Sequence, residues 1–313
     1  MVSVSRDGGG TWTQRQATDA SLNMQQGKRR ACTIRTDSDG VVYLAYVVQG
    51  FDMPSIGEQM LVKSLDGGEH WSRPEPFEEI NDACYNRDPA QNRCTYEGPF
   101  GARSDFVPAP SLDIANGAPS GADATDELVV NWSDGRDGLN HELSLLSYST
   151  DGATTWSDPQ TVSLPGNRSL YTAAGISPDG TTLYVVYMAF KTEYQTDLSA
   201  PRLLHSVFRR APIDPTGVPI GWDTLVDGPA GDNRGGAIVG PSGANFAGDY
   251  VYVAATRAYG VGVTTDVRNA LDCPGFDAWR TSLLTPTPLP FPRLNAVCPT
   301  GFGNSDIYAF TTG

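Results

Sequence analysis

Four arginines stand in the same sequence setting and have the chemistry to bind an anionic ligand. Each follows a glycine by two or three residues and comes just before a segment of strand character: Arg29, Arg103, Arg168 and Arg234. A guanidinium group stays charged, and its planar fork donates two parallel hydrogen bonds to a carboxylate. Brought together, four such groups would form a positive ring within a protein of formal net charge −14. We therefore predict an anionic small ligand.

A structural role is the alternative for the same arginines. Acidic residues lie close to two of them in the sequence, namely Asp105 and Asp232. An arginine that pairs with a carboxylate of a neighbouring repeat holds the fold together instead of meeting a ligand. The elements that carry the four arginines decide between the two alternatives.

These elements form a repeat with a period of about 65 to 80 residues. Each unit opens at a glycine and an arginine and continues into a strongly apolar segment. The apolar segments are VVYLAYVV from Val41, ELVVNW from Glu127, TLYVVYMAF from Thr182 and YVYVAAT from Tyr250. A strand that is apolar at nearly every position is covered on both faces, as is the middle strand of a sheet between two other sheets. Repetition of such units favours a β-propeller, and a tandem of sandwich domains is the alternative.

Each unit closes on a turn of the form Ser-x-Asp-Gly-x-x-x-Trp, seen as SRDGGGTW from Ser5, SLDGGEHW from Ser64 and STDGATTW from Ser149. We expect the aspartate to accept hydrogen bonds from backbone N–H groups of the turn and the next glycine to adopt a positive φ. The tryptophan is expected to bury its ring between strands. The motif is interpreted as structural, with a ligand site as the alternative. Its residues are Asp7, Trp12, Asp66, Trp71, Asp151 and Trp156.

This turn resembles the Asp-box, or BNR, repeat of the sialidase (neuraminidase) superfamily. The segment NWSDGRD from Asn131 is also similar to the Trp-x-Asp-x-Arg that often ends the second strand of a blade. The resemblance covers essentially the whole chain at the level of repeats. It implies an all-β fold, a β-propeller of sialidase type with about six blades in the parent protein and about four to five visible in this chain.

The resemblance also implies a reaction, the hydrolysis of a terminal acidic sugar. Enzymes of this family grip the sugar carboxylate with arginines and use a tyrosine nucleophile, a glutamate that activates it and an aspartic acid that donates the proton. The candidates here are Tyr171, Glu97 and Asp105, although none sits in a motif that singles it out. Because the same box occurs in proteins without catalytic activity, a carbohydrate- or protein-binding module is the alternative.

One long insertion and two cysteine pairs complete the expected architecture. We predict a single propeller domain over residues 1–313, trimmed at its N-terminus from a larger parent, with residues 258–304 forming an inserted lobe. Trp279 of the lobe either stacks on a sugar ring or pins the loop down. The predicted disulfides are Cys84–Cys94 and Cys273–Cys298, with free surface thiols as the alternative.

Composition excludes several classes of partner. The net charge of −14 disfavours nucleic acid, and the longest apolar run is far too short for a membrane span. No metal or cofactor is expected, because the three histidines stand at unrelated spacings and phosphate-cradling glycine loops are missing. The cysteine pairs and the low content of charged residues favour an extracellular or cell-surface protein. Another protein docking on a propeller face is a further expectation.

Overall fold

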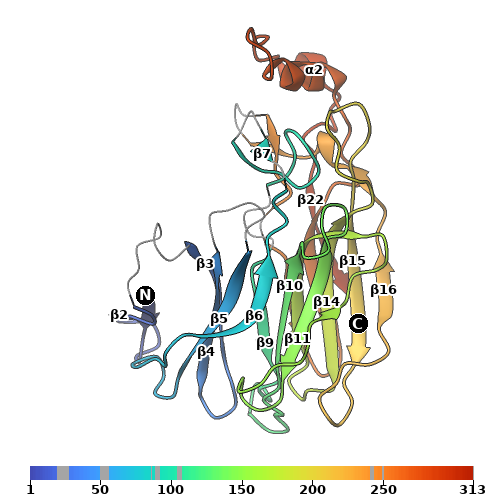
Figure 1. Cartoon of the computed structure of the whole chain (residues 1–313). Coiled ribbons are helices and arrows are strands. Elements are labelled where there is room, and N and C mark those ends of the chain that lie inside the picture. Colours follow the sequence, from blue (N-terminus) through green and yellow to red (C-terminus); the bar gives the residue numbers. More distant parts are fainter. Residues whose placement is uncertain are drawn as a thin grey trace.

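The structure is a computed structural model, and it describes residues 1–19, 28–49, 56–85, 87–88, 92–103, 108–239, 243–248 and 250–312. These residues form an all-β protein built from antiparallel sheets (Figure 1). The all-β prediction is confirmed. The short helices α2 (Pro274–Ser282) and α3 (Leu294–Val297) both lie in the lobe at one end of the molecule.

Four sheets repeat one topology, in which strands that follow each other in the sequence are neighbours in the sheet. The first contains β3 (Lys28–Thr36), β4 (Val42–Gln49), β5 (Ile56–Ser64) and β6 (Glu75–Asn81). The second contains β9 (Ser111–Ile114), β10 (Leu128–Asp134), β11 (Leu143–Ser149) and β12 (Gln160–Thr161). The third contains β13 (Arg168–Ile176), β14 (Thr182–Phe190), β15 (Leu203–Pro212) and β16 (Asp223–Asp227). The fourth contains β20 (Tyr252–Ala255), β21 (Gly260–Asp266) and β22 (Asp306–Thr311).

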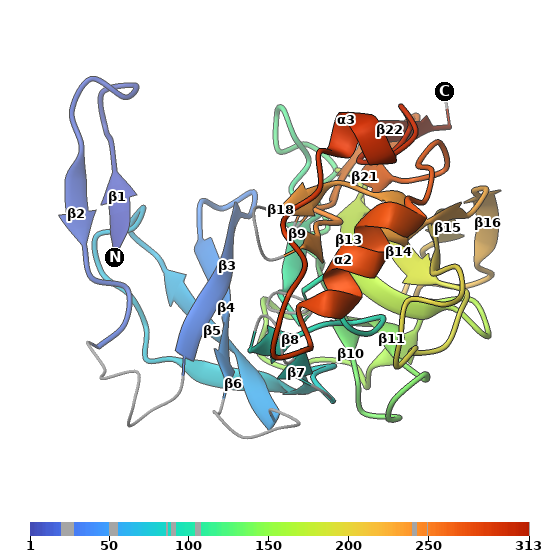
Figure 2. The same cartoon turned by 90° about the horizontal axis from the view of Figure 1, so that it is seen from above.

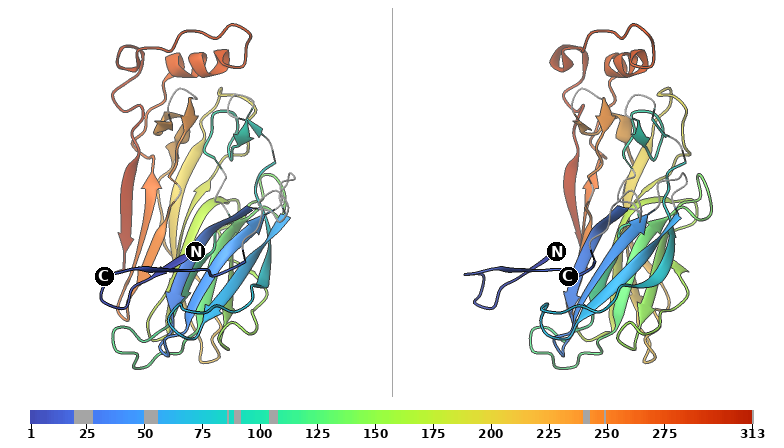
Figure 3. Two further views of the ribbon diagram at one scale, coloured as in Figure 1. Left: turned by 90° about the vertical axis from the view of Figure 1, so that its left-hand side faces the viewer. Right: turned by 60° about the vertical axis from the view of Figure 1, so that its left-hand side comes forward.

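Shorter strands lie outside these sheets or at their margins. They are β1 (Val2–Val4), β2 (Thr13–Arg15), β7 (Arg87–Asp88), β8 (Arg93–Cys94), β17 (Gly231–Asp232), β18 (Ile238–Val239) and β19 (Ala244–Asn245). The β1–β2 hairpin projects from the side of the first sheet (Figure 3). It is tied there by Arg6 and Arg15, which both form ion pairs with Glu69.

Two of the middle strands are buried on both faces, as their continuous apolar sequence predicts. Every residue of β10 is buried, and so is every residue of β14 except the first. The same expectation is wrong for YVYVAAT, because its strand β20 is the first strand of the fourth sheet, at the sheet edge, where Tyr252 and Ala254 are exposed.

The buried clusters lie between adjacent sheets: Tyr43 of the first sheet packs in one cluster with Leu128 and Trp132 of the second. Val129 of the second sheet packs in another cluster with Val185 of the third. The cores therefore sit between blades.

The first strands of the four sheets lie at the centre. Strand β3 contacts β9, β9 contacts β13, and β13 contacts β20. Seen from above, the sheets are arranged side by side around these inner strands (Figure 2). This is the arrangement of β-propeller blades about a hub. The four sheets together with the β1–β2 hairpin account for the four to five blades predicted.

The two ends of the blades differ. We call the "turn end" the end with the turns at Asp66, Asp151, Asp179 and Asp214, which join neighbouring strands of one sheet. We call the "lobe end" the opposite end, with residues 82–85, 92–103, 191–202 and 267–304 (Figures 1 and 3). Strand β21 falls inside the predicted lobe 258–304, so the lobe itself starts after Asp266. Two glycines in the sequence GVGVTTD gave this strand the appearance of a loop.

The three Ser-x-Asp-Gly-x-x-x-Trp turns share one hydrogen-bond pattern. In each copy the serine hydroxyl donates to the aspartate, at 2.8 to 2.9 Å. The backbone N–H four residues after the aspartate donates to the same carboxylate oxygen, also at 2.8 to 2.9 Å. The glycine after each aspartate has a positive φ, of 67° to 69°. These bonds hold the pKa of Asp7 at about 2 and keep the pKa values of Asp66 and Asp151 well below their ordinary value.

The tryptophans of the three turns do not share one environment. Trp156 stacks on Phe77, with ring centroids 4.6 Å apart, and borders the core between the first two sheets. Trp71 packs on the cluster around Tyr46. The expectation of a buried ring is wrong for Trp12, which is 63 % exposed because the β1–β2 hairpin stands apart from the main sheets.

Candidate ligand-binding channel

A cavity of about 440 Å³ lies at the hub. The first strands of all four sheets, or the residues just before them, contribute to its wall. The lining consists of Ala31, Cys32, Thr33, Arg35, Ala109, Pro110, Ser111, Tyr171, Thr172, Tyr250, Val251 and Tyr252. We call this cavity the hub cavity.

Aromatic rings and hydroxyl groups dominate the hub cavity. Tyr171 is 4 % exposed, and its hydroxyl donates to the carbonyl oxygen of Arg103 at 3.0 Å. Tyr250 and Tyr252 are 71 % and 64 % exposed. Their rings are nearly parallel, with centroids 6.4 Å apart, because residues two apart in an extended segment point to the same face. The cavity therefore offers aromatic surface beside the hydroxyl groups of Thr33 and Ser111.

Arg35 is the charged side chain of the described lining. Its Nε lies 3.0 Å from Oδ1 of Asp113 on the neighbouring strand β9, and its Nη1 donates to the carbonyl oxygen of Ile34 at 2.9 Å. Burial raises the pKa of Asp113, and Arg35 opposes this shift. Sequence reasoning missed Arg35, because it stands inside a strand and not after a glycine. The signal was its alternation with Thr33, which places both residues on one face of β3.

The four predicted arginines lie in separate settings and not in a common ring, and none belongs to the described lining of the hub cavity. Arg168 is buried between two blades. Its Nε and Nη2 donate to the two oxygens of Glu142, at 2.8 and 2.9 Å, and both side chains are at most 3 % exposed. Its remaining bonds go to the carbonyl oxygens of Tyr96 and Thr192. Arg168 therefore joins strands and connections of the second and third sheets.

Arg234 lies among carboxylates at the lobe end. Its guanidinium nitrogens are 2.7 Å from Asp232, 3.3 Å from Asp272 and 3.7 Å from Asp277. The pKa of Asp277 is raised to about 6, chiefly by burial; Arg280 opposes this shift and Asp272 adds to it. Arg168 and Arg234 thus both form ion pairs. Glu142 was not foreseen as the partner of Arg168.

The other two predicted arginines make different contacts. Arg29 donates to the hydroxyl of Thr18 at 3.1 Å and to the carbonyl oxygen of Asp19 at 2.7 Å. It lines a second cavity, of about 340 Å³, between β3 and the segment that follows the β1–β2 hairpin. The guanidinium of Arg103 lies over the ring of Phe246, 5.2 Å from its centroid. A cation–π contact of this type stabilises the guanidinium group.

Of the three predicted catalytic residues, Tyr171 lines the hub cavity, and Asp105 lies outside the described residues. Glu97 is fully buried. Both its oxygens accept the N–H of Ala102 at 2.9 Å, and Oε1 accepts the amide of Asn233 at 2.6 Å. Burial raises its pKa, and the nearby Arg202 opposes the shift. Glu97 thus fastens a loop at the lobe end and is not part of the described lining with Tyr171.

Trp279 belongs to the core of the lobe. It is 4 % exposed, and its ring centroid lies 5.0 Å from that of Phe276 and 4.8 Å from that of Phe291. The neighbouring Arg280 is fully buried and donates to the carbonyl oxygens of Gly243 and Arg234, at 2.8 and 3.0 Å. Stacking of Trp279 on a sugar is not compatible with this burial. These side chains pin the lobe down, which was the alternative.

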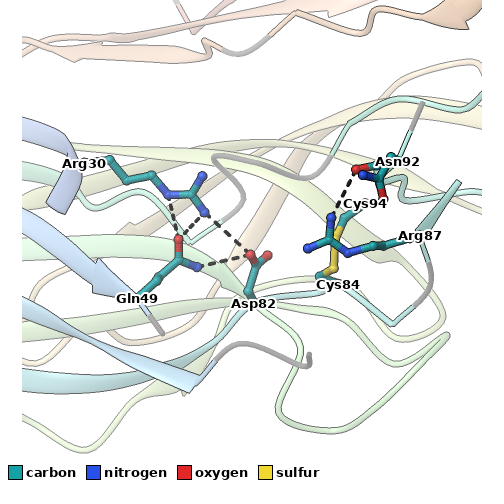
Figure 4. Close-up of a disulfide and its surroundings, with 7 residues drawn as sticks. All are labelled: Arg30, Gln49, Asp82, Cys84, Arg87, Asn92 and Cys94. Carbon is teal, nitrogen blue, oxygen red and sulfur yellow. Dashed lines mark hydrogen bonds and ion pairs between the residues drawn. A yellow bond between two sulfur atoms is a disulfide. The ribbon is translucent and has the colours of Figure 1, made fainter. Parts of the chain in front are cut away.

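Both predicted disulfides are present, and Cys32 is a free, exposed cysteine. The Cys84–Cys94 bond stands beside a polar network that reaches the first sheet (Figure 4). In this network Arg30 donates to Gln49 at 2.6 Å and pairs with Asp82 at 3.6 Å, while Gln49 donates to Asp82 at 3.1 Å. The network ties the connection after β6 to the start of the first blade.

The Trp-x-Asp-x-Arg segment ends β10 as the resemblance implies. Trp132 Nε1 donates to Asp134 at 3.0 Å, and Arg136 Nε donates to the same carboxylate at 2.9 Å. Strand β21 ends on an equivalent pair that sequence reasoning missed, Asp266 and Arg268, with two contacts of 2.7 and 2.8 Å. Both pairs are internal to one blade, so their role is structural.

Within the described ranges, no group of three acidic, histidine or cysteine side chains is arranged to hold a metal ion. Neither helix of the described lobe has the length and apolar character to cross a membrane.

No protein-family model matches the chain, and neither does any curated protein. Several solved structures are similar to it. The α-L-arabinanase of Penicillium chrysogenum complexed with arabinobiose is 15% identical, with a TM-score of 0.47 over 83% of this chain and 65% of that one. The GH93 α-L-arabinofuranosidase of Fusarium graminearum is 15% identical, with a TM-score of 0.45 over 86% of this chain and 73% of that one. The intramolecular trans-sialidase of Ruminococcus gnavus is 18% identical, with a TM-score of 0.35 over 59% of this chain and 32% of that one.

The chain thus spans less than two thirds of the arabinanase, and about a third of the trans-sialidase. The fold described above rests on the strand pairing and packing of this chain itself.

Proposed function

We propose that the protein is a glycan-recognising propeller that binds a sugar residue in the hub cavity. The observation that carries this proposal is the cavity of about 440 Å³ at the meeting point of four blades, lined by three tyrosines and several hydroxyl groups. A volume of this order accommodates a small ligand. Tyrosine rings present an apolar face to the C–H groups of a sugar, and hydroxyl groups exchange hydrogen bonds with its polar edge.

The charge of the cavity bears on which sugar is bound. The family resemblance favours a terminal acidic sugar held by several arginines. In the described lining Arg35 supplies the positive charge, and Asp113 already neutralises part of it at 3.0 Å. We therefore propose that the cavity prefers a neutral sugar to a sialic acid.

Hydrolysis is the second candidate function, favoured by the place of Tyr171 in the cavity wall. A tyrosine nucleophile needs a base that withdraws its proton. The hydroxyl of Tyr171 donates to the backbone carbonyl of Arg103, and Glu97 is engaged elsewhere. Glu97 is therefore not that base, and an enzyme assay decides between binding and turnover. The two disulfides favour an oxidising, extracellular setting for this activity.

Calorimetric titration with a neutral and an acidic probe, arabinobiose and sialyllactose, tests the proposal. We expect arabinobiose to bind more tightly. Replacing Tyr252 by Ala should weaken binding about three- to tenfold, because one aromatic contact is lost. Tyr259→Ala is the matched control, since Tyr259 is also an exposed tyrosine of the fourth blade but lies outside the described lining.

Fluorogenic glycosides of both sugars distinguish binding from hydrolysis. Turnover that disappears in Tyr171→Phe, with binding retained, would establish the hydrolase. Absence of binding to both probes in the folded wild-type protein would refute the proposed glycan function.

A further inference from the structure

A third cavity lies at the turn end, between the second and third blades. Its volume is about 510 Å³. Four separate segments form its wall: residues 125–127 before β10, residue 150 after β11, residues 179–181 between β13 and β14, and residues 213–217 after β15. We call it the turn-end cavity. It lies outside the hub, and its residues have no part in the proposed glycan site.

A buried carboxylate without a partner lines the turn-end cavity. Glu127 is 2 % exposed, and its Oε1 has no hydrogen-bond partner among the described residues. Oε2 of Glu127 lies close to Gly217, because a Cβ atom added to this glycine would stand 3.4 Å from that oxygen. The carboxylate of Glu127 therefore lies against the turn of the third blade. Buried polar groups are normally hydrogen-bonded, and a buried charge is normally paired or bound to a metal. Glu127 must therefore either bind a ligand or carry a proton.

Two further acids line the cavity with one oxygen each engaged in their own turns. Asp214 accepts bonds from Thr216 and Val218 through Oδ1, at 2.7 to 3.1 Å. Asp179 accepts bonds from Ser177 and Thr181, again through Oδ1, at 2.6 to 3.3 Å.

The carboxylate atoms that could bind a cation in this cavity are all oxygens. The described lining contains neither lysine nor arginine. The hydroxyl groups of Thr125, Thr150 and Thr181 add to them. Arg257 interacts with Asp179 at longer range, but it forms a 2.6 Å ion pair with Asp123.

We propose that the turn-end cavity binds Ca²⁺, with the carboxylate of Glu127 as its buried ligand and Asp214 as the second acidic ligand. Carboxylates and hydroxyl groups are the hard oxygen ligands that Ca²⁺ takes, whereas Zn²⁺ would need nitrogen or sulfur. The described residues hold no group of three acids placed to cage a metal. Water must therefore complete the shell, and a dissociation constant of about 10⁻⁴ to 10⁻³ M is expected.

The electrostatics of the cavity agree with its geometry. Burial raises the pKa of Glu127, and the charge of Asp214 adds to this shift, so that the pKa is about 8. The turn hydrogen bonds lower the pKa values of Asp214 and Asp179. A cation between Glu127 and Asp214 would supply the positive charge that the described lining lacks.

Such a site would join two blades, because Glu127 belongs to the second and Asp214 to the third. The cation would contact both. We therefore expect Ca²⁺ to raise the melting temperature of the propeller.

The test is calorimetric titration of the full chain with CaCl₂ at constant pH and ionic strength, with the melting temperature as a second readout. Glu127→Gln keeps the shape of the neutral carboxyl and should lose Ca²⁺ binding while remaining folded. Glu75→Gln, at an exposed acid of β6, is the matched control and should bind as the wild type does.

Two results overturn the proposal. The first is no heat and no rise in melting temperature at about 10 mM CaCl₂. The second is equal Ca²⁺ affinity in the wild type and in Glu127→Gln. If Glu127→Gln does not fold, Asp214→Asn takes its place, and a Ca²⁺ affinity equal to that of the wild type excludes the proposed site.

Discussion

The turn end and the lobe end of this propeller are stabilised in different ways. At the turn end, the carboxylates of the Asp-box turns bind groups at most four residues away, and the same pattern recurs in three turns. At the lobe end, contacts join residues far apart in the sequence. Glu97 and Asn233 are separated by 136 positions, and Arg168 and Glu142 by 26. Each of these long-range contacts occurs once.

This difference predicts where a mutation should act only locally and where its effect should spread to other parts of the fold. An exposed turn that holds itself together can be weakened without loss of the blade. A buried ion pair between blades cannot lose one member without leaving a charge in a dry environment. The predictions below start with this lobe-end pair and finish with the turns.

Breaking the buried ion pair should have the largest effect. Arg168→Ala leaves Glu142 buried and unpaired, so we expect a loss of about 3 to 5 kcal/mol in the free energy of unfolding. Urea denaturation measures this loss. Arg210→Ala is the control, because Arg210 pairs with Asp223 on the surface. Such an exposed pair contributes about 1 kcal/mol at most. Equal losses in the two variants would remove the distinction between buried and exposed pairs.

Removing the lobe disulfide should rank second. Cys273 and Cys298 close a loop with a sequence separation of 25, and the crosslink should stabilise it by about 3 kcal/mol. In Cys273→Ser/Cys298→Ser we expect faster proteolysis within residues 267–304, while the four sheets stay intact. Mass spectrometry of the fragments locates the cuts. First cuts within the blades would show that the lobe does not unfold on its own.

Replacing the tryptophan by alanine should change stability by different amounts in two equivalent turns. Trp156→Ala removes a ring that stacks on Phe77 beside the core, so a loss of about 2 kcal/mol is expected. Trp12→Ala removes a ring that is 63 % exposed, so its effect should stay within about 0.5 kcal/mol. Denaturant midpoints of both variants measure the contrast. A larger loss for Trp12 would mean that the exposed hairpin has a stabilising contact elsewhere.

Protonation of the turn carboxylates in acid should have the smallest effect on stability. Hydrogen bonds to the ionised carboxylates depress their pKa values, that of Asp7 from 3.8 to about 2. A depressed pKa contributes stability above the ordinary value, and this contribution is lost as pH falls from about 4 towards 2. Asp66→Asn should therefore show a shallower fall in melting temperature over this window than the wild type. Identical slopes would show that the Asp66 turn does not contribute.

The fold was predictable because its signals are local and repeated. The apolar segments around β10 and β14 indicated strands covered on both faces, and both strands are buried. The Asp-box turns were predictable for the same reason. The exception is Trp12, whose burial depends on what lies next to its hairpin.

The candidate site was predictable only in part. Tyr171, which the resemblance suggested as a nucleophile, lines the hub cavity, whereas Arg35, Tyr250 and Tyr252 were not foreseen. The equivalent sequence settings of Arg168 and Arg234 indicated one shared site. The structure places them in different ion-pair networks, because the acids that meet them come from unrelated loops. The spacing of residues in the sequence does not show which side chains from different loops form contacts.

By itself, the sequence determined the antiparallel blades and their closing turns, and it indicated which cysteines pair. In the blades and turns the interacting atoms lie within a few residues, or in the next strand of the same hairpin. Only the tertiary structure decided which arginines are neutralised, where the lobe docks and which side chains line the hub and turn-end cavities. Those outcomes depend on the distance between surfaces of different blades, which is set by the packing of the whole chain.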